Sequence, residues 1–228
     1  MKKLFILLVT QLISYSAWSQ ALNIHYKNGQ IIQYNMDNVD YIEFTKEQNN
    51  SAQVSSEKAV DLGLSVKWAS CNLGASSPEE FGDCFAWGET SPKAEYTKDN
   101  YAFYDSKTES YIDIGTDISY TEFDAAYVNW GDQWRMPTQD ELWELKKNCT
   151  WTWSNVNGVN GYVVKGSNGN SIFFPVGAYT IRLWGCRIWN SDDGTNKEAE
   201  TLVLKTGDAP NRSASVRYRW CWIRPVMP

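Results

Sequence analysis

The chain has 228 residues, with 21 Lys and Arg against 27 Asp and Glu, and a formal net charge of −6. This length allows one sizeable domain and an accessory element, since domains commonly run to about 100–200 residues. An acidic chain whose basic residues are scattered along the sequence is a poor candidate for binding nucleic acid or an anionic membrane surface.

Residues 1–19 have the features of a secretory signal peptide. Lys2 and Lys3 form a basic start, the apolar run LFILLVTQLI follows, and Ala17-Trp18-Ser19 is a small-x-small cleavage site. The apolar run is too short to span a membrane, and no cysteine follows the site, so a lipoprotein anchor is not expected. We therefore expect an exported chain in the periplasm, on the outer surface or in the medium.

Residues 20–45 are expected to form a small N-terminal β element. Apolar and polar residues alternate there, and Asn28-Gly29 is a strong β-hairpin signal because both residues tolerate positive φ. His25, the only histidine, alternates away from the apolar face, which favours a solvent-facing residue over a catalytic base. Residues 46–59 are polar and are expected to be a linker to the main domain, residues 60–228.

Three short helices are expected in the main domain. The first would begin at Ser77-Pro78 and end by Gly82, and the second would be capped by Asp124 and stopped by Gly131. The third begins at Thr138, which forms a capping box with Glu141. One face of the third helix carries apolar residues at helical spacing: Leu142, Leu145 and Cys149.

After Cys149 the apolar pattern changes to a period of two. TWTWSNV, GYVVKG and NSIFFPV are expected strands, with turns at Asn157-Gly158, Asn160-Gly161 and Asn168-Gly169. Three further strands are expected at TIRLWGCRIW, ETLVLKT and SVRYRWCWIRPV. Two or three short helices with many short antiparallel strands predict an α+β domain.

A succession of motifs resembles the Fibrobacter succinogenes major paralogous domain, which many exported proteins of Bacteroidetes carry. The motifs are VDLGLSVKWASCNLGA, FAWGET, AAYVNWGDQWRMPT, CTWTW, NGVNGY, GSNGNSIFFP and the terminal IRPV. The likeness covers nearly all of residues 60–227, and the 22–45 hairpin resembles an element often found before such domains. The chain departs from the family pattern at RIWNSDDG and RWCWIRPV.

The family is similar in turn to the C-type-lectin-like and formylglycine-generating-enzyme folds. The resemblance therefore implies a C-type-lectin-like α+β domain with surface or secreted proteins as its relatives. Because a fold hosts many functions, the likeness implies architecture more than activity.

Two roles are open for Arg135, which lies between Trp134 and the Met136-Pro137 corner. Its guanidinium could hold an anionic ligand, or it could stack on Trp and bond backbone carbonyls, bracing the entry to the helix at Thr138. We favour the brace, because the residue before proline is held extended and the helix cap follows at once. The structural residues expected at this corner are Trp134, Arg135, Pro137, Thr138 and Glu141.

The tryptophans and one acidic loop are the candidate ligand-binding features. Exposed indoles would stack on sugars, but Trp151/Trp153 and Trp220/Trp222 alternate at period two, which favours packing for most of them. The loop WNSDDGTNKEAE offers oxygen ligands that calcium prefers, although a solvated acidic loop is favoured. The candidate ligand-binding residues are Trp189, Asn190, Asp192, Asp193 and Glu198.

Five cysteines remain in the exported chain, and an odd number leaves at least one of them unpaired within the chain. No CxxC pair is present, so a zinc site has no support. Cys186 and Cys221 lie on late strands, and a disulfide between them is the ordinary expectation in an exported domain. The resemblance to the formylglycine-generating fold offers the alternative of a copper-binding cysteine pair.

The expected function is that of an exported, non-catalytic binding or adhesion module. Its ligand would be a glycan or another protein at the cell surface, without a resident cofactor unless calcium occupies the acidic loop. No Ser/His/Asp arrangement is available, because the only histidine is His25. Two alternatives stay open: a structural subunit of a surface assembly, and an enzyme of the formylglycine-generating type.

Overall fold

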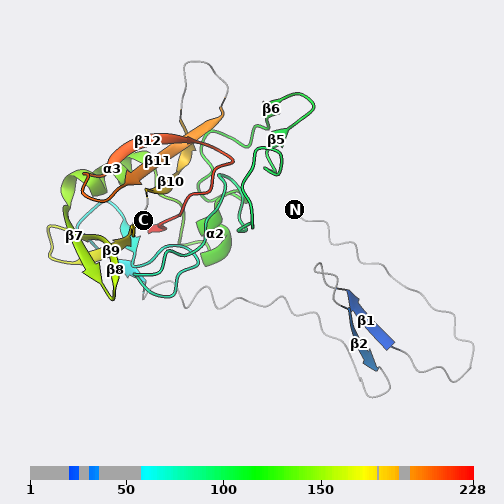
Figure 1. Cartoon of the computed structure of the whole chain (residues 1–228), viewed down its shortest axis with the longest axis horizontal. Helices are drawn as coiled ribbons and strands as arrows, with labels where there is room; N and C mark the ends of the chain where they lie inside the picture. The colour runs from blue at the N-terminus through cyan, green and yellow to red at the C-terminus, as the bar shows by residue number, and fades with distance from the viewer. Residues whose placement is uncertain (1–20, 26–30, 36–57, 179, 190–195) are drawn as a thin grey trace, which may run out of the picture. The chain divides into compact units, whose positions relative to one another are not determined.

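The computed structural model describes residues 21–25, 31–35, 58–178, 180–189 and 196–228 (Figure 1). The chain divides into two compact units, Met1–Glu47 and Gln48–Pro228.

Unit 1 contains two antiparallel strands, β1 (Ala21–His25) and β2 (Ile31–Asn35). Leu22 pairs with Tyr34 and Ile24 with Ile32, so the predicted pairing of the first two alternating runs is confirmed. The predicted turn at Asn28-Gly29 and the side chain of His25 lie outside the described residues. The predicted signal sequence, residues 1–19, lies outside them as well.

Unit 2 is built on small antiparallel sheets. Its strands are β3 (Ala59–Val60), β4 (Lys67–Ala69), β5 (Tyr104–Asp105), β6 (Ser110–Tyr111), β7 (Thr150–Val156), β8 (Val159–Lys165), β9 (Ser171–Pro175), β10 (Ile181–Ile188), β11 (Glu198–Leu204), β12 (Asn211–Val216) and β13 (Val226–Met227). Three sheets have the orders β7-β8-β9, β10-β11-β12 and β13-β4-β3, and β5-β6 is a two-stranded pair. In Figure 1 the β7-β8-β9 sheet and the β5-β6 pair lie at opposite ends of the unit.

Two helices are described in unit 2, and both begin where the sequence predicts. Helix α2 (Ala125–Trp130) is capped by Asp124 and ends at Gly131, whose φ of 93° is accessible to glycine. Helix α3 (Gln139–Asn148) has the predicted capping box of Thr138 and Glu141. The prediction of a helix after Ser77 is wrong. One hydrogen bond, from the Glu80 N–H to the Ser77 carbonyl, closes a turn there instead.

The strand predictions need two corrections. Asn160-Gly161 is not a turn but part of β8, where a side chain on Gly161 would meet the Phe174 carbonyl oxygen at 2.1 Å. Glycine is needed there because the neighbouring strands approach closely. In the sequence, a glycine that allows close approach cannot be told from a glycine in an Asn-Gly turn. The last run, SVRYRWCWIRPV, is divided: β12 ends at Val216, and only β13 follows near the terminus.

Two apolar clusters form the core of unit 2. The first packs α3 against the β7-β8-β9 sheet and one side of β10 and β11, and includes Trp68, Leu142, Leu145, Val164, Phe174 and Leu202. The second lies around α2 and the other part of β10, and includes Trp87, Met136, Trp184, Cys186, Cys221 and Ile223. Few helices and mostly antiparallel strands agree with the α+β class at this coarse level. Within the described part of the chain, no helix combines the length and apolar character needed to cross a bilayer.

Candidate functional site

The Arg135 side chain is bound by neighbouring residues of the same corner. The guanidinium makes a paired contact with Glu141, with Nη1 2.8 Å from Oε2, and Nη1 also donates to the Met136 carbonyl at 3.0 Å. Burial alone would raise the pKa of Glu141, but the Arg135 hydrogen bonds and charge hold it below its usual value. The aromatic ring that the guanidinium faces is Tyr120, whose centre lies 5.8 Å from the guanidinium carbon. These contacts bind both terminal nitrogens of the guanidinium to the protein itself.

Asp124 ties helix α2 to the same corner. Its buried carboxylate accepts N–H groups from Tyr120, Ala126, Tyr127 and Met136, at distances between 2.9 and 3.2 Å. A carboxylate that satisfies four backbone donors is a structural cap.

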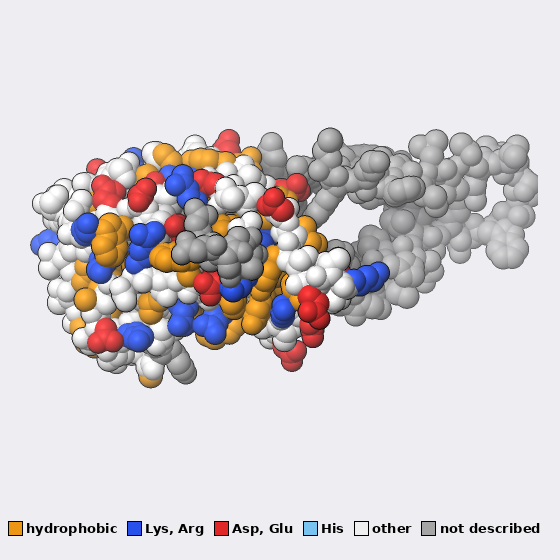
Figure 2. Space-filling view, turned by 90° about the horizontal axis from the view of Figure 1, so that it is seen from above, with side chains coloured by type: hydrophobic (Ala, Val, Ile, Leu, Met, Phe, Trp, Pro, Cys, Tyr) orange, Lys and Arg blue, Asp and Glu red, His pale blue; other side chains and the backbone are white. Residues whose placement is uncertain are grey.

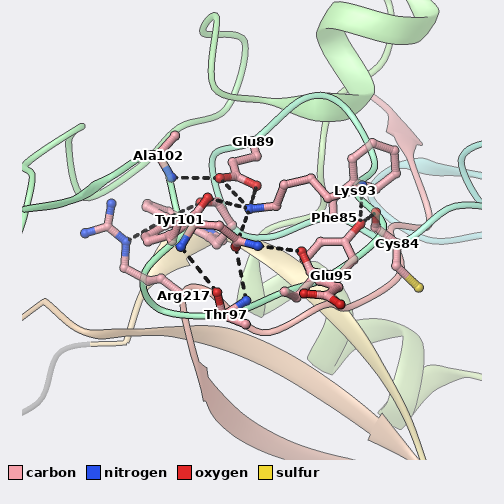
Figure 3. Close-up of polar contacts among 12 residues, drawn as sticks. Cys84, Phe85, Glu89, Lys93, Glu95, Thr97, Tyr101, Ala102 and Arg217 are labelled. Carbon is pink, nitrogen blue, oxygen red and sulfur yellow. Dashed lines mark hydrogen bonds and ion pairs between the residues drawn. The ribbon is translucent and has the colours of Figure 1, made fainter. Parts of the chain in front are cut away.

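A second polar network surrounds Arg217, at the end of β12 (Figure 3). Nε donates to the Tyr101 hydroxyl at 3.1 Å, and the terminal nitrogens donate to the carbonyls of Asn196 and Ile112. The guanidinium carbon lies 4.9 Å from the centre of the Trp87 ring, and Arg217 is only 1% exposed. Arg217 itself fills the aromatic enclosure, so a ligand cation has no room there.

Lys93 and Glu89 close the neighbouring loop in Figure 3. The Glu89 carboxylate accepts the Lys93 ammonium at 2.7 Å and the Ala102 N–H at 2.8 Å. Lys93 also donates to the Asn100 carbonyl at 3.0 Å. These contacts tie Lys93 and Glu89 to other residues of the same loop.

The cysteines differ from the expected arrangement. All five, including Cys186 and Cys221, are free thiols, so the predicted Cys186–Cys221 disulfide is wrong. Burial raises the pKa of both thiols well above the ordinary value, with the Asp117 carboxylate adding to the effect at Cys186. Both side chains contribute to the second apolar cluster, where a cysteine acts as a small apolar residue.

The predicted acidic loop is described only at its two ends. Asn190, Asp192 and Asp193 lie outside the described residues. Trp189 donates its backbone N–H to the Glu198 carbonyl at 3.0 Å, and the Arg212 guanidinium lies 4.9 Å from its ring centre. These contacts join the two ends of the loop. Among the residues that the structure describes, no group of His, Cys, Asp and Glu side chains could hold a metal ion.

Glu200, the last residue of the predicted acidic stretch, lies on β11 and lines a hollow of about 370 Å³ with Asp117 and Arg187. Glu200 is 8% exposed, its Oε2 has no hydrogen-bond partner among the described residues, and its Oε1 is 3.6 Å from Arg212. Burial raises the pKa of Glu200 to about 7. Sequence reasoning missed this carboxyl, because its strand neighbours do not distinguish a buried glutamate from an exposed one.

A larger concave feature lies on another part of unit 2. Three hollows of about 470, 290 and 370 Å³ adjoin, because the first shares Arg182 with the second and Lys146 and Asp208 with the third. We call them together the aromatic–basic groove. Its principal lining residues are Lys146, Trp151, Trp153, Tyr162, Arg182, Lys205, Asp208, Asn211, Ser213, Arg219, Trp220 and Trp222.

Aromatic side chains line both ends of the groove. At one end Trp153 packs edge-on against Tyr162 with ring centres 4.9 Å apart. At the other end Trp220 packs edge-on against Trp222 at 5.1 Å. Trp220 is 46% exposed, whereas Trp222 is 7% exposed and its Nε1 has no acceptor among the described residues. The period-two pattern predicts packing for most of these tryptophans, which Trp222 bears out, and Trp220 is the exposed member of its pair.

The turn between β11 and β12 is fixed to the groove by Tyr162. The Tyr162 hydroxyl lies 2.7 Å from the Lys205 carbonyl and 2.6 Å from the Asp208 carbonyl. Gly207, within the same turn, has a φ of 76°. The groove is therefore held in position by its own hydrogen bonds before any ligand arrives.

Basic side chains lie in and beside the middle of the groove. Figure 2 shows one face of the protein, on which Lys and Arg side chains lie between apolar patches. Lys146 comes from α3, Arg182 from β10, Lys205 follows β11 and Arg219 follows β12. The sequence shows these cations as scattered, and the fold gathers them.

Comparison with protein-family models, with curated proteins and with solved structures found no match for this chain. The groove is the feature of the described structure that best fits a ligand, because its hollows are near the size of known ligand sites and combine aromatic with polar lining.

Proposed function

We propose that this chain is an exported, non-catalytic binding module that holds a glycan chain in the aromatic–basic groove. The observation that carries the proposal is the placement of Trp153 and Trp220 at the two ends of three adjoining hollows. We further propose a C-type-lectin-like domain, supported by the motif resemblance and by the small antiparallel sheets with two helices.

The groove has the chemistry that sugars require. The apolar face of a sugar ring packs on an indole, while its hydroxyl groups exchange hydrogen bonds with polar side chains. Trp220 offers an exposed ring, and Asn211 and Ser213 offer polar groups between the aromatic ends.

Burial of the thiols supports the non-catalytic proposal over an enzyme of the formylglycine-generating type. A copper-binding cysteine acts as a thiolate, and burial disfavours ionisation. Cys186 and Cys221 are both 0% exposed, and burial raises the pKa of each.

A structural subunit of a surface assembly is the second candidate function. The observation that favours it is the two-stranded sheet of β1 and β2, since two strands alone are marginally stable and gain from a partner. Deleting residues 22–45 would then abolish assembly while leaving unit 2 folded. Unchanged assembly by the deletion variant would contradict this candidate.

The proposed function is tested by a glycan screen of the mature chain, with and without calcium, followed by affinity measurements on the strongest hit. Trp220→Ala and Trp153→Ala should each weaken binding by about ten- to hundredfold, the loss that removal of an aromatic anchor causes. Ile112→Ala is the control, because Ile112 is an exposed apolar residue outside the groove. An empty screen, or unchanged affinity in both Trp variants, would refute the proposal.

A further inference from the structure

We propose that the glycan held in the aromatic–basic groove is acidic, a polysaccharide whose sugars carry carboxylate or sulfate groups. This inference rests on the proposed function and adds the chemical class of the ligand. Its basis is a set of four cations in the groove that form no ion pair with a carboxylate among the described residues.

The four cations converge from separate elements. Lys146, Arg182 and Lys205 line the largest hollow, and Arg182 lines the next one together with Arg219. Arg182 therefore stands where the two hollows adjoin, with Trp220 and Trp222 beyond it.

The groove cations are not paired with the protein's own carboxylates. Among the described residues, no ion pair joins Lys146, Arg182, Lys205 or Arg219 to an Asp or Glu. Lys146 instead lies over the Trp143 ring, with Nζ 4.3 Å from its centre. By contrast, Arg135 and Arg187 both have carboxylate partners.

The charge of the groove is opposite to that of the whole chain. Four cations and the single carboxylate of Asp208 give the groove a net charge of +3, whereas the chain carries −6, so all other residues together sum to −9. A cationic site in an anionic protein focuses attraction on one place and repels a polyanion elsewhere. An anionic ligand would consequently dock at the groove and not over the whole surface.

The aromatic ends distinguish a polysaccharide from other polyanions. Trp153 and Trp220 lie at the two ends of the groove, with the basic side chains between them, so a chain of sugars would alternate stacking with ion pairing. Nucleic acid would instead call for a continuous basic track along its phosphates, which a chain of net charge −6 with four groove cations does not offer. A polysaccharide with spaced charges fits both features.

The test compares matched pairs of polysaccharides that differ only in charge, with calorimetry on the mature chain. Polygalacturonate is set against its fully methyl-esterified form, and dextran sulfate against dextran, so the two arms separate carboxylate from sulfate recognition. At least one acidic member should bind about tenfold or more tightly than its neutral partner, and its affinity should fall by about tenfold or more between about 50 and about 500 mM NaCl.

Variants of the groove cations test whether the preference for acidic glycans arises in the groove. Arg182→Gln and Lys205→Gln should each weaken acidic-glycan binding by about tenfold, and each should weaken binding of the acidic glycan more than binding of its neutral partner. Lys107→Gln is the matched control, since Lys107 is an exposed lysine in the β5-β6 turn, outside the groove.

The outcomes separate the two proposals. Equal affinity for the charged and neutral partners, lost in Trp220→Ala, would overturn this inference and leave the proposed function standing. Absence of binding to every glycan would overturn both. Single-stranded DNA binding as tightly as the best acidic glycan would also overturn the inference, because the groove would then respond to charge alone.

Discussion

Replacing Arg224 should cost more stability than replacing any exposed arginine of the same segment. Arg224 is 0% exposed and donates to the Asn72 side chain at 2.9 Å, the Ala69 carbonyl at 3.0 Å and the Phe173 carbonyl at 2.8 Å. Its guanidinium also lies 4.2 Å from the centre of the Phe174 ring. Burial lowers its pKa to about 9, which still leaves the group protonated at neutral pH.

The expected loss follows from the acceptors that Arg224→Met would leave behind. Each buried acceptor without a donor costs about 1–3 kcal/mol, and the desolvation of the removed charge offsets part of the total. We expect the free energy of unfolding to fall by about 3–5 kcal/mol, and Tm by about 10 °C for a chain of this size.

Urea unfolding followed by tryptophan fluorescence measures this loss. Arg219→Met is the matched control, because the Arg219 side chain is exposed and makes no hydrogen bond among the described residues. This variant should change stability by no more than about 0.5 kcal/mol. A loss below about 1 kcal/mol for Arg224→Met would refute the reasoning that this arginine braces β4 against β9.

Three further predictions concern the core polar groups. Asp124→Ala should lower the free energy of unfolding by about 3–5 kcal/mol, because four N–H groups lose their acceptor. Asp124→Asn keeps one oxygen and should lose less stability. Equal losses for the two variants in denaturation curves would contradict this prediction. Folded Glu200 keeps its proton up to a pKa of about 7, whereas an unfolded glutamate loses it near 4.5, so stability should fall between these pH values. Glu200→Gln should remove up to about 3 kcal/mol of that fall in pH-dependent unfolding curves. Parallel curves for wild type and Glu200→Gln would count against the assignment. Thiol titration of the non-reduced, denatured chain should count five thiols. A disulfide-linked peptide that joins Cys186 to Cys221 would contradict the free-thiol state of these two cysteines.

Local signals in the sequence were sufficient where neighbouring residues decide the structure. The capping box of Thr138 and Glu141 fixes the start of α3, and Asn157-Gly158 forms the turn between β7 and β8 with φ values of 51° and 87°. The turn predicted at Asn160-Gly161 was wrong, because the need for glycine at position 161 comes from Phe174 on the adjoining strand.

Features set by distant residues were not predictable. Arg217, Arg219 and Arg224 lie within eight positions, yet the first and last are buried and Arg219 is exposed. Their spacing shows neither which face is inside nor which carbonyls are free to accept. The groove depends likewise on α3, β10 and β11 meeting, so Lys146 and Arg182 become neighbours only in the fold.

The affinity of Trp220→Ala for the best glycan found in the screen tests the central claim most directly. Trp220 is exposed at one end of the aromatic–basic groove, so its loss should not disturb the core. The account predicts an unchanged unfolding curve with binding weakened by about tenfold or more. Wild-type affinity in a correctly folded Trp220→Ala variant would contradict it.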